Sequence, residues 1–381
     1  MKNIVYIGKY TLNENFLTAE GKRVLNQVKY LLNRHEVFVI TFSSQSSNYR
    51  FNLNFKTKEQ KGFLDLLGFP FYWITIFWNL IKRKKKENFL LLESNVEIYS
   101  ICPIFFAKIL GYKIIHDVVE DFSLASNLSR NQKISITIGK WFQKNISKYC
   151  SGVIVISENL ATKYNQIDLP IIKIYNSVDK QEYDDSDYPI ETFNFFYSGS
   201  FNAKDGVLDL IEAFNFLSKK EENVHLYLTG RGHGQYFNDC LSKIKNNNKI
   251  AYKGFLPENE MFSYIKKSHV LCITRSNSAF ANNGFPFKLA EYLSFGIPVL
   301  TTTVSDIALL LKNNENAFFA IPESVKSIAE TMEKIILNYP KAIEIGKKGR
   351  LFCLENFSIE AIGSELEGFV ERVHTIKDII E

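Results

Sequence analysis

The sequence contains few cysteines and no cluster of them. The five residues lie far apart, with no CxxC pair and no Cys/His group: Cys102, Cys150, Cys240, Cys272 and Cys353. This pattern argues against a disulfide scaffold and a structural zinc site. It predicts reduced, mostly buried thiols in a cytoplasmic protein, with no bound metal.

Long apolar runs are also missing. No stretch of about 18 uninterrupted apolar residues occurs, so we expect no transmembrane helix. The apolar run in the opening MKNIVYIGKYT is too short for a signal peptide and predicts a first core strand. No strand pattern is followed by GxGxxG and a downstream acid, which argues against a nicotinamide-dependent dehydrogenase.

Neither sign of charge dominates the chain. With 46 Lys and Arg against 41 Asp and Glu, the net charge is +5. This modest excess suits an anionic ligand or an anionic membrane surface, but it is too small to indicate nucleic acid. The 381 residues are too many for one ordinary core, so we expect two α/β domains of roughly 180 residues each.

One segment combines aromatic and basic residues. Residues 69–80 read FPFYWITIFWNL, and a cluster of lysine and arginine follows from Lys82 to Lys86. A buried helix that ends in a solvated basic turn would explain this pattern, since cations are favoured at a helix C-terminus. A patch over residues 69–86 that touches anionic lipid headgroups would explain it equally well. Both interpretations stay open at this point.

Short apolar runs alternate with helical patterns along the chain. This alternation predicts an α/β protein with two doubly wound, Rossmann-like domains, each a parallel sheet covered by helices. The pattern restarts near residue 190, after the polar, acidic stretch 179–189, which we interpret as a linker. The expected strands are 4–7, 37–41, 89–92, 113–116, 153–156, 171–174, 193–197, 224–229, 249–252, 270–273, 299–301 and 317–321.

The first motif that suggests chemistry covers residues 193–214, FNFFYSGSFNAKDGVLDLIEAF. A strand, a small-residue turn at Gly199 and Ser200, and a helix expected from about Asp205 follow one another. Free N–H groups and the helix dipole at such a junction favour a phosphate. Lys204 would add a mobile positive charge there. Alone the motif is weak, because a plain βα turn with a solvated lysine reads the same way.

The second motif covers residues 282–302, NNGFPFKLAEYLSFGIPVLTT. Pro286 suits the first turn of a helix that ends at Gly296. Glu291, one turn in, would accept both hydroxyls of a ribose, whereas it would repel a phosphate. In isolation, a solvated helix glutamate is the simpler interpretation.

Together these segments resemble the GT4 family of GT-B glycosyltransferases. The stretch GFPFKLAEYLSFGIPVLTT resembles the family signature G-F-P-x-K-L-x-E-Y-L-x-x-G-x-P-V almost throughout. Other landmarks fall in the family's order along nearly the whole chain, at KIIHDVVEDF (113–122), VIVISENLATKY (153–164), IYNSVDKQEY (174–183), LYLTGRGHG (226–234) and YKGFLPENEMFSYIKKSHVLCI (252–273).

The resemblance implies two domains that face a central cleft. Residues 1–180 would form an acceptor domain, residues 190–357 a nucleotide-sugar domain, and residues 358–381 a helix that crosses back to the first domain. Catalytic roles would fall to His116, Lys204 and Glu291, and Asp117 and Glu120 would lie on the acceptor side. The implied donor-binding residues are Gly8, Gly199, Ser200, Lys204, Gly230, Arg231, Gly254, Phe255, Leu256, Asn283, Gly284, Phe285, Pro286, Phe287, Lys288 and Glu291.

The chain departs from the family pattern at the donor site. Asn283 stands where the first glutamate of the family's paired-Glu motif would be, and Ser200 stands where many members carry a basic residue. These changes leave fewer cations for the diphosphate. Arg231 or Lys288 would compensate, as a hypothesis.

The implied reaction is retaining, metal-independent transfer of a sugar from a nucleotide-diphosphate donor, a UDP- or GDP-sugar, to a hydroxyl. No cofactor is expected besides this co-substrate. The acceptor would be a glycan or lipid-linked glycan of capsule or O-antigen biosynthesis, reached by a cytoplasmic enzyme at the inner face of the plasma membrane. A sugar-nucleotide 2-epimerase of the same fold and a non-catalytic partner subunit remain alternatives. The sequence leaves open the sugar, the acceptor and the oligomeric state.

Overall fold

The computed structural model divides the chain into two compact units. The first consists of Met1–Ser177 with Ile359–Glu381, and the second of Val178–Ser358. The structure describes residues 1–12, 18–43, 52–56, 69–92, 98–121, 130–181 and 191–377. Most of the predicted linker, residues 182–189, lies outside these ranges. We describe each unit by itself.

The first unit is built on a parallel sheet with the order β3-β2-β1-β4-β5-β6-β7. Every residue of β1, β4 and β6 is buried, as expected for strands covered on both faces. The strands are β1 Asn3–Gly8, β2 Glu36–Ser43, β3 Asn52–Lys56, β4 Asn88–Leu92, β5 Lys113–Val118, β6 Gly152–Val155 and β7 Ile171–Lys173.

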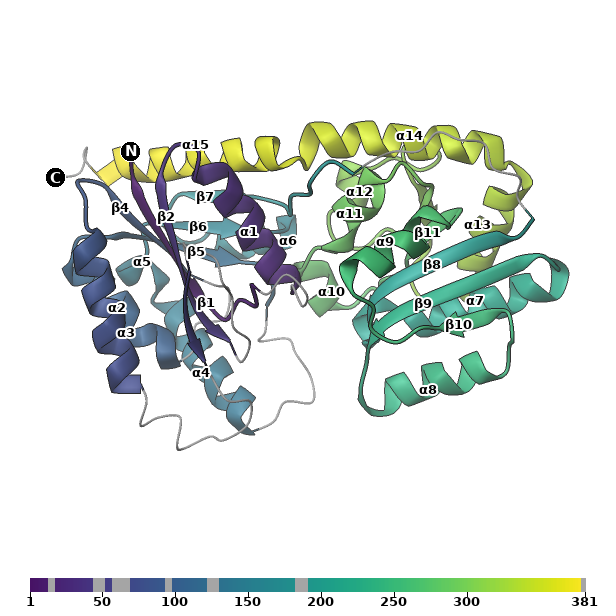
Figure 1. The fold of residues 1–381 in the computed structure, drawn as a ribbon, viewed down its shortest axis with the longest axis horizontal. Helices are drawn as coiled ribbons and strands as arrows, with labels where there is room; N and C mark the ends of the chain where they lie inside the picture. The colour runs from purple at the N-terminus through teal and green to yellow at the C-terminus, as the bar shows by residue number, and fades with distance from the viewer. Residues whose placement is uncertain are drawn as a thin grey trace. The chain divides into compact units, whose positions relative to one another are not determined.

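Helices connect these strands and cover the sheet (Figure 1). Thr18 and Ser157 cap α1 and α6, because each side-chain oxygen accepts a hydrogen bond from a backbone N–H of the first turn. The helices are α1 Ala19–Leu31, α2 Phe69–Arg83, α3 Ile98–Ile109, α4 Arg130–Lys144, α5 Ile146–Tyr149, α6 Glu158–Tyr164 and α15 Ile359–Lys377. None of the helices in the described ranges combines the length and apolarity needed to cross a bilayer.

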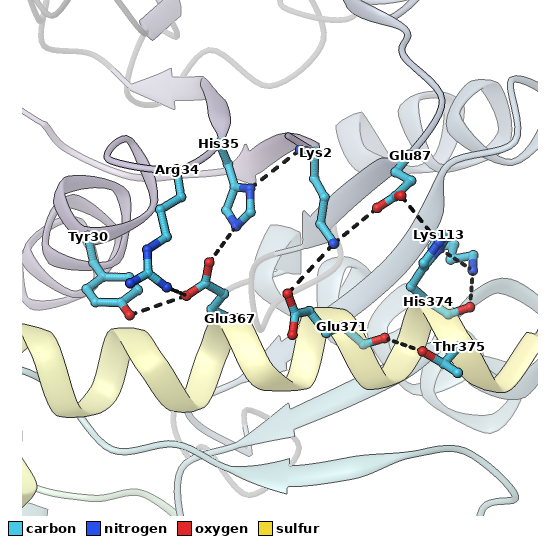
Figure 2. A network of polar contacts seen from close by, with 10 residues as sticks. All are labelled: Lys2, Tyr30, Arg34, His35, Glu87, Lys113, Glu367, Glu371, His374 and Thr375. Atoms are coloured by element: carbon cyan, nitrogen blue, oxygen red, sulfur yellow. Dashed lines mark hydrogen bonds and ion pairs between the residues drawn. The ribbon is translucent and has the colours of Figure 1, made fainter.

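The last helix, α15, makes polar contacts with the rest of the first unit, among them those of Glu367. The Glu367 carboxylate accepts hydrogen bonds from Tyr30 at 3.3 Å and Arg34 at 2.9 Å, and it lies 3.0 Å from His35 Nε2 (Figure 2). Burial lowers the pKa of His35, although the Glu367 charge opposes this shift. The helical prediction for the final segment is therefore confirmed over Ile359–Lys377.

The same helix packs tightly on β6. A Cβ added at Gly152 would lie 2.8 Å from Val373 Cγ2 and 2.9 Å from Phe369 Cζ. Glycine at this strand start lets α15 approach the sheet closely. The buried apolar side chains of α15 are Ile359, Ile362, Leu366, Phe369, Val370 and Val373.

The second unit is built on a parallel sheet with the order β10-β9-β8-β11-β12-β13 (Figure 1). Its strands are β8 Phe193–Ser200, β9 Val224–Arg231, β10 Ile250–Tyr252, β11 Val270–Ile273, β12 Val299–Thr302 and β13 Phe318–Ala320. Its helices are the 3₁₀ turn η3 Ala203–Asp205, α7 Val207–Lys220, α8 Gly234–Lys245, α9 Glu258–Lys266, α10 Ala279–Asn283, α11 Lys288–Ser294, α12 Ile307–Leu310, α13 Val325–Leu337 and α14 Tyr339–Asn356.

Both sheets confirm the predicted fold class of doubly wound, Rossmann-like domains. All twelve strands expected from the sequence are present, with boundaries that shift by a few residues. The sequence analysis missed β3, Asn52–Lys56, which pairs with β2 at the edge of the first sheet. Its segment NLNFK lacks the continuous apolar run by which buried strands are recognised.

Candidate active site

The strand order of the second sheet defines where a ligand would bind. The connections run from β8 outward in one direction through β9 and β10, and in the other direction through β11, β12 and β13. In open parallel sheets, ligands bind beyond the carboxyl ends of the strands at the point where the order reverses. Here that point lies between β8 and β11, so the loops after Ser200 and Ile273 form its walls.

Two glycines allow the strand ends at this point to lie close together. Gly199 of β8 and Gly230 of β9 are register partners, and a Cβ on Gly230 would lie only 1.7 Å from the Gly199 carbonyl oxygen. A Cβ on Gly199 would lie 2.3 Å from the Lys288 Nζ atom. The ammonium group of Lys288 therefore rests directly against the Gly199 turn.

Lys288 is the first residue of α11, and its charge is held in unusual surroundings. Its Nζ lies 4.1 Å from the ring centroid of Tyr197, and burial lowers its pKa to about 8. The positive charges of Arg275 and Lys204 contribute to this lowering, while the carboxylates of Asp205 and Glu291 oppose it. Residues of the turn after β8, the loop after β11 and the start of α11 thus act on one another at the switch point.

Lys204 lies in the turn between β8 and α7. The helix begins at Val207, and its N-cap is Gly206 with φ of 62°, so the predicted start at about Asp205 is two residues early. Asp205 is instead buried and accepts a hydrogen bond from the Ser200 hydroxyl. Left-handed backbone at Gly206 ends the 3₁₀ turn that holds Lys204.

The loop after β11 contacts this turn from the other side. The Ser276 N–H donates to the Lys204 carbonyl at 3.0 Å, and the Thr274 hydroxyl donates to the Gly206 carbonyl at 3.0 Å. Lys204 Nζ lies 4.7 Å from the ring centroid of Phe280. These contacts hold the lysine beside the loop that carries Arg275.

Arg275 is a basic residue that the sequence analysis missed. It is buried, its Nη2 donates to the Ala281 carbonyl at 3.0 Å, and its own carbonyl accepts from the Thr302 hydroxyl at 2.8 Å. A lone arginine in the loop TRSNS carries no motif. The available signal was that Arg275 follows the buried strand VLCI closely. This places Arg275 at the switch point only because β11 lies next to β8.

The predicted ribose and phosphate residues lie along the start of α11. The helix begins at Lys288 with Phe287 as its N-cap, so Pro286 precedes the first turn, where its carbonyl accepts from the Leu289 N–H at 3.1 Å. Glu291 lies in the first turn and is partly exposed. Asn283 ends α10, and the segment from Gly284 to Phe287 links the two helices.

Tyr292 fixes α11 against β8. Its hydroxyl oxygen accepts a hydrogen bond from the Ser198 N–H at 2.7 Å. Because Tyr292 is buried, this bond holds the helix that carries Lys288 and Glu291 at the end of the strand that carries Gly199.

The ends of β9 and β10 form a second wall. The Gly254 carbonyl accepts from the Gly230 N–H at 2.8 Å and from the Thr229 hydroxyl at 2.6 Å. The Arg231 Cζ atom lies 4.0 Å from the ring centroid of Phe255, whose ring is partly exposed. Leu256, also partly exposed, completes this wall.

The remaining predicted residues lie in the first unit, near the carboxyl ends of β1 and β5. Gly8 ends β1 and is buried. His116 lies inside β5 rather than at its end, is 3% exposed and makes an edge contact with Phe142 at 5.5 Å. Glu120 follows β5 by two residues and is partly exposed. Their roles stay predictions.

Asp117 follows His116 in β5, so the two side chains point to opposite faces of the sheet. Its carboxylate accepts two hydrogen bonds from Arg23, at 2.9 and 3.0 Å. Arg23 also donates to the carbonyls of Ile174 and Tyr175 and to the side chain of Asn176. The contacts of Asp117 are those of a buried structural ion pair, and its predicted place on the acceptor side stays a prediction.

Comparisons with known proteins agree with this fold. Residues 181–352 match the family described as glycosyl transferases group 1. Over 180 residues the chain is 26% identical to the capsular polysaccharide biosynthesis glycosyltransferase CapM of Staphylococcus aureus. The matched stretch covers 46% of this chain and 45% of CapM. The matched stretch thus spans about half the length of that relative.

Solved structures are similar over almost the whole chain at low sequence identity. Sucrose-phosphate synthase of Thermosynechococcus elongatus has a TM-score of 0.76 at 13% identity, with 99% of this chain and 100% of that chain covered. Anabaena HepE, in complex with UDP and glucose, has a TM-score of 0.73 at 14% identity, with 98% of this chain and 100% of the HepE chain covered. TarM has a TM-score of 0.73 at 13% identity, with 97% of this chain and 99% of the TarM chain covered. These likenesses confirm the GT-B fold, while the cleft between its two domains stays a prediction.

Proposed function

Because residues 181–352 form a group 1 glycosyltransferase domain, we propose that this chain transfers a sugar from a nucleotide-diphosphate sugar to an acceptor hydroxyl. One observation carries the proposal. Lys204 of the turn after β8, Arg275 of the loop after β11 and Lys288 at the start of α11 act on one another electrostatically beside the Gly199 turn at the switch point of the second sheet. A diphosphate is the ligand that such a group of cations fits.

These cations would also stabilise the leaving group of the transfer reaction. When the bond from the anomeric carbon to the β-phosphate oxygen breaks, negative charge develops on that phosphate. Fixed positive groups stabilise developing charge strongly where water is excluded. Lys288 already rests against Gly199, and Arg275 is buried. Neither side chain has to move far to stabilise the negative charge on the β-phosphate. Metal-independent transfer follows from this arrangement as part of the proposal.

The nucleoside would lie along the same edge of the sheet. In this proposal the Glu291 carboxylate accepts hydrogen bonds from both ribose hydroxyls. The base lies against the wall formed by Gly254, Phe255 and Leu256, where Arg231 stacks on the Phe255 ring. HepE is described in complex with UDP-glucose, which supports a nucleotide-sugar donor, with UDP or GDP as the expected nucleotide.

Transfer would proceed with retention of configuration. The acceptor hydroxyl attacks the anomeric carbon from the face on which the phosphate departs, and the departing β-phosphate oxygen takes the hydroxyl proton. The products are the new glycoside and the nucleoside diphosphate. Gly8, His116 and Glu120 are the residues that we assign to the side of the transferred sugar and the acceptor.

The acceptor that we propose is a growing glycan or a lipid-linked glycan. CapM, the relative from Staphylococcus aureus, is named for capsular polysaccharide biosynthesis, which supports a role in surface polysaccharide assembly. A lipid-linked acceptor would bring the enzyme to the inner face of the plasma membrane.

A thermal-shift screen against UDP-, GDP-, ADP- and CMP-sugars tests the donor site. A donor that binds the folded state at 100 times its Kd stabilises the protein by about 2.7 kcal/mol, so one nucleotide class should raise Tm by several degrees. Lys204→Ala and Glu291→Ala should each abolish most of this shift and most of the transfer, while Lys253→Ala, an exposed lysine at the end of β10, should not.

A transfer assay separates this function from its alternatives. Nucleotide release that depends on an added acceptor supports a transferase. Release without any acceptor would indicate an epimerase, and a Tm that no sugar nucleotide changes would indicate a non-catalytic subunit. Full transfer by both variants at low donor concentration would refute the assigned site.

A further inference from the structure

Three segments of the first unit, which contain four helices and the basic turn after α2, carry an excess of positive charge. Residues 69–86, 98–112 and 130–149, which contain α2, α3, α4 and α5, carry no Asp or Glu. Their eleven basic residues are Lys82, Arg83, Lys84, Lys85, Lys86, Lys108, Arg130, Lys133, Lys140, Lys144 and Lys148. Since the whole chain has a net charge of only +5, the rest of it is net acidic.

The same helices expose large apolar side chains in rows. On α2, Phe71, Ile74, Trp78 and Ile81 are exposed at a spacing of i, i+3, i+7 and i+10, which places them along one face of the helix. On α3, Ile101, Phe105 and Ile109 are exposed at a spacing of four residues, again on one face. Their exposed fractions range from 37% to 69%.

The helices that carry these rows adjoin one another. Rings of α2 and α3 meet at Phe77 and Phe106, whose centroids lie 4.9 Å apart, and Figure 1 shows the two helices side by side. Lys108 of α3 donates to the Lys148 carbonyl of α5. On α4, the exposed ring of Trp141 lies 5.9 Å from Tyr149. We call the exposed side of α2, α3 and α4 the basic–aromatic face.

Large exposed apolar side chains in the second unit show no such grouping. Phe216, Leu309, Leu337 and Leu351 lie on four different helices, one on each, while Phe255 and Ile321 lie outside helices and strands. Scattered single residues of this kind are normal on a protein surface, whereas grouped ones mark an interaction site.

Several lysines on this face are available to an anion. Lys85 pairs with Glu36, and Arg83 stacks on Phe38 with its Cζ 3.6 Å from the ring centroid. Lys82, Lys84 and Lys86 are exposed, and none of them pairs with a carboxylate in the described part of the chain. Lys140 and Lys144 of α4 are exposed as well.

We propose that the basic–aromatic face binds an anionic lipid bilayer, with its apolar side chains in the interfacial layer and its lysines on the headgroups. Exposed aromatic rings beside lysines suit a bilayer, because the rings enter the boundary between headgroups and acyl chains while the lysines meet phosphates. A soluble polyanion would use the lysines but not Phe71, Trp78 or Phe105. The inference stands apart from the proposed transfer reaction, because vesicle binding requires neither donor nor acceptor.

The chain supplies its own probe for the test. Its three tryptophans, Trp73, Trp78 and Trp141, all lie on α2 or α4, so intrinsic fluorescence reports on this face. The full chain should bind vesicles of phosphatidylcholine with 30% phosphatidylglycerol, shift its emission to the blue, and be quenched by brominated acyl chains. Pure phosphatidylcholine vesicles should bind it far more weakly.

Two sets of variants separate the charged and apolar contributions. Lys82→Gln/Lys84→Gln/Lys86→Gln should lower the partition coefficient about 100-fold, at about fivefold per lysine. Phe71→Ser/Phe105→Ser should lower it at least tenfold and remove the blue shift. The matched controls in the second unit, Lys245→Gln/Lys341→Gln/Lys348→Gln and Leu337→Ser/Leu351→Ser, should bind like the parent protein. All the replaced side chains are exposed, so Tm should change little in every variant.

Equal binding by the parent and both variant sets would overturn the proposal. A second outcome would also overturn it: the lysines are needed for binding to soluble polyphosphate, and vesicle binding causes neither a blue shift nor quenching. That result would indicate a polyanion site in place of a bilayer site.

Discussion

Lys288 holds a positive charge where burial disfavours it. Its pKa is lowered from 10.5 to about 8, mainly by burial and also by the neighbouring cations Arg275 and Lys204. The unfolded chain therefore binds more protons at this residue between about pH 8 and pH 10.5. Across that window, Lys288 should make the free energy of unfolding of the ligand-free protein rise with pH. Below pH 8 the residue is protonated in both the folded and the unfolded state, so its contribution is constant.

Donor binding should respond in the opposite direction. Because a diphosphate requires the charged ammonium, the affinity of the parent protein should fall as pH rises through about 8. Lys288→Met should bind about 10- to 100-fold more weakly at pH 7, the loss expected for one charge-assisted hydrogen bond. Calorimetric titrations with the preferred sugar nucleotide from pH 6.5 to 9.5 measure both effects.

The pH profile provides the control for this prediction. Lys288→Met should show no step in donor affinity near pH 8, while Lys253→Met should reproduce the parent profile. A parent profile that is flat to pH 9.5 would contradict the role of Lys288 in binding the diphosphate.

Residues that act together in this fold were hard to identify when their contacts span long distances in sequence. The Gly199 turn and Glu291 could be predicted because each belongs to a local motif. Arg275 could not, since its interaction with Lys288 follows from the order of strands rather than from its neighbours in sequence. Asp117 was assigned to the acceptor, but its partner Arg23 lies 94 residues away and nothing local reveals the pair.

Among the elements, α1 is tied to the first sheet by the buried pair of Arg23 and Asp117. Arg23 reaches from α1 to β5 and to the chain that follows β7, so one side chain joins three segments. A buried pair is weak evidence of net stabilisation, but the loss of one partner leaves an uncompensated buried charge.

Asp117→Asn should therefore lower the free energy of unfolding by about 3–5 kcal/mol. Urea denaturation followed by circular dichroism measures this change. Glu158→Gln, which breaks the more exposed pair with Lys173, should cost less than about 1 kcal/mol and is the matched control. If Asp117→Asn kept full stability but lost transfer, Asp117 would serve the acceptor rather than the fold.

Element boundaries show where local patterns were sufficient. Buried parallel strands are continuous apolar runs, and β1, β4 and β11 were therefore readable. The start of α7 was placed two residues early, because a polar residue before an apolar helix looks like an N-cap, whereas the left-handed Gly206 that actually precedes the helix depends on its contact with the Thr274 carbonyl.

At the scale of the whole molecule, the first unit is discontinuous in sequence. It takes Met1–Ser177 and then α15 from beyond Ser358, while the second unit is one continuous segment. A chain that ends at Ser358 would lose the six buried apolar side chains of α15, each worth roughly 1.5–3 kcal/mol on burial. That loss is comparable to the full stability of a typical domain.

We therefore expect the chain truncated at Ser358 to lose the structure of its first unit and to keep that of its second. Hydrogen exchange measured by mass spectrometry should show lost protection in β1 and β4–β6, with β8, β9 and β11 still protected. A chain that ends at Lys377 is the control and should exchange like the full protein. Intact protection of β6 in the shorter chain would show that α15 is dispensable.

The late position of α15 also sets an order of events during synthesis. When the ribosome has released residues 178–358, the second sheet has every strand that it needs, whereas the first still has Gly152 uncovered and Glu367 not yet made. The first unit is thus completed after the second, and a nascent chain that stalls before α15 would present an unfinished domain to chaperones and proteases.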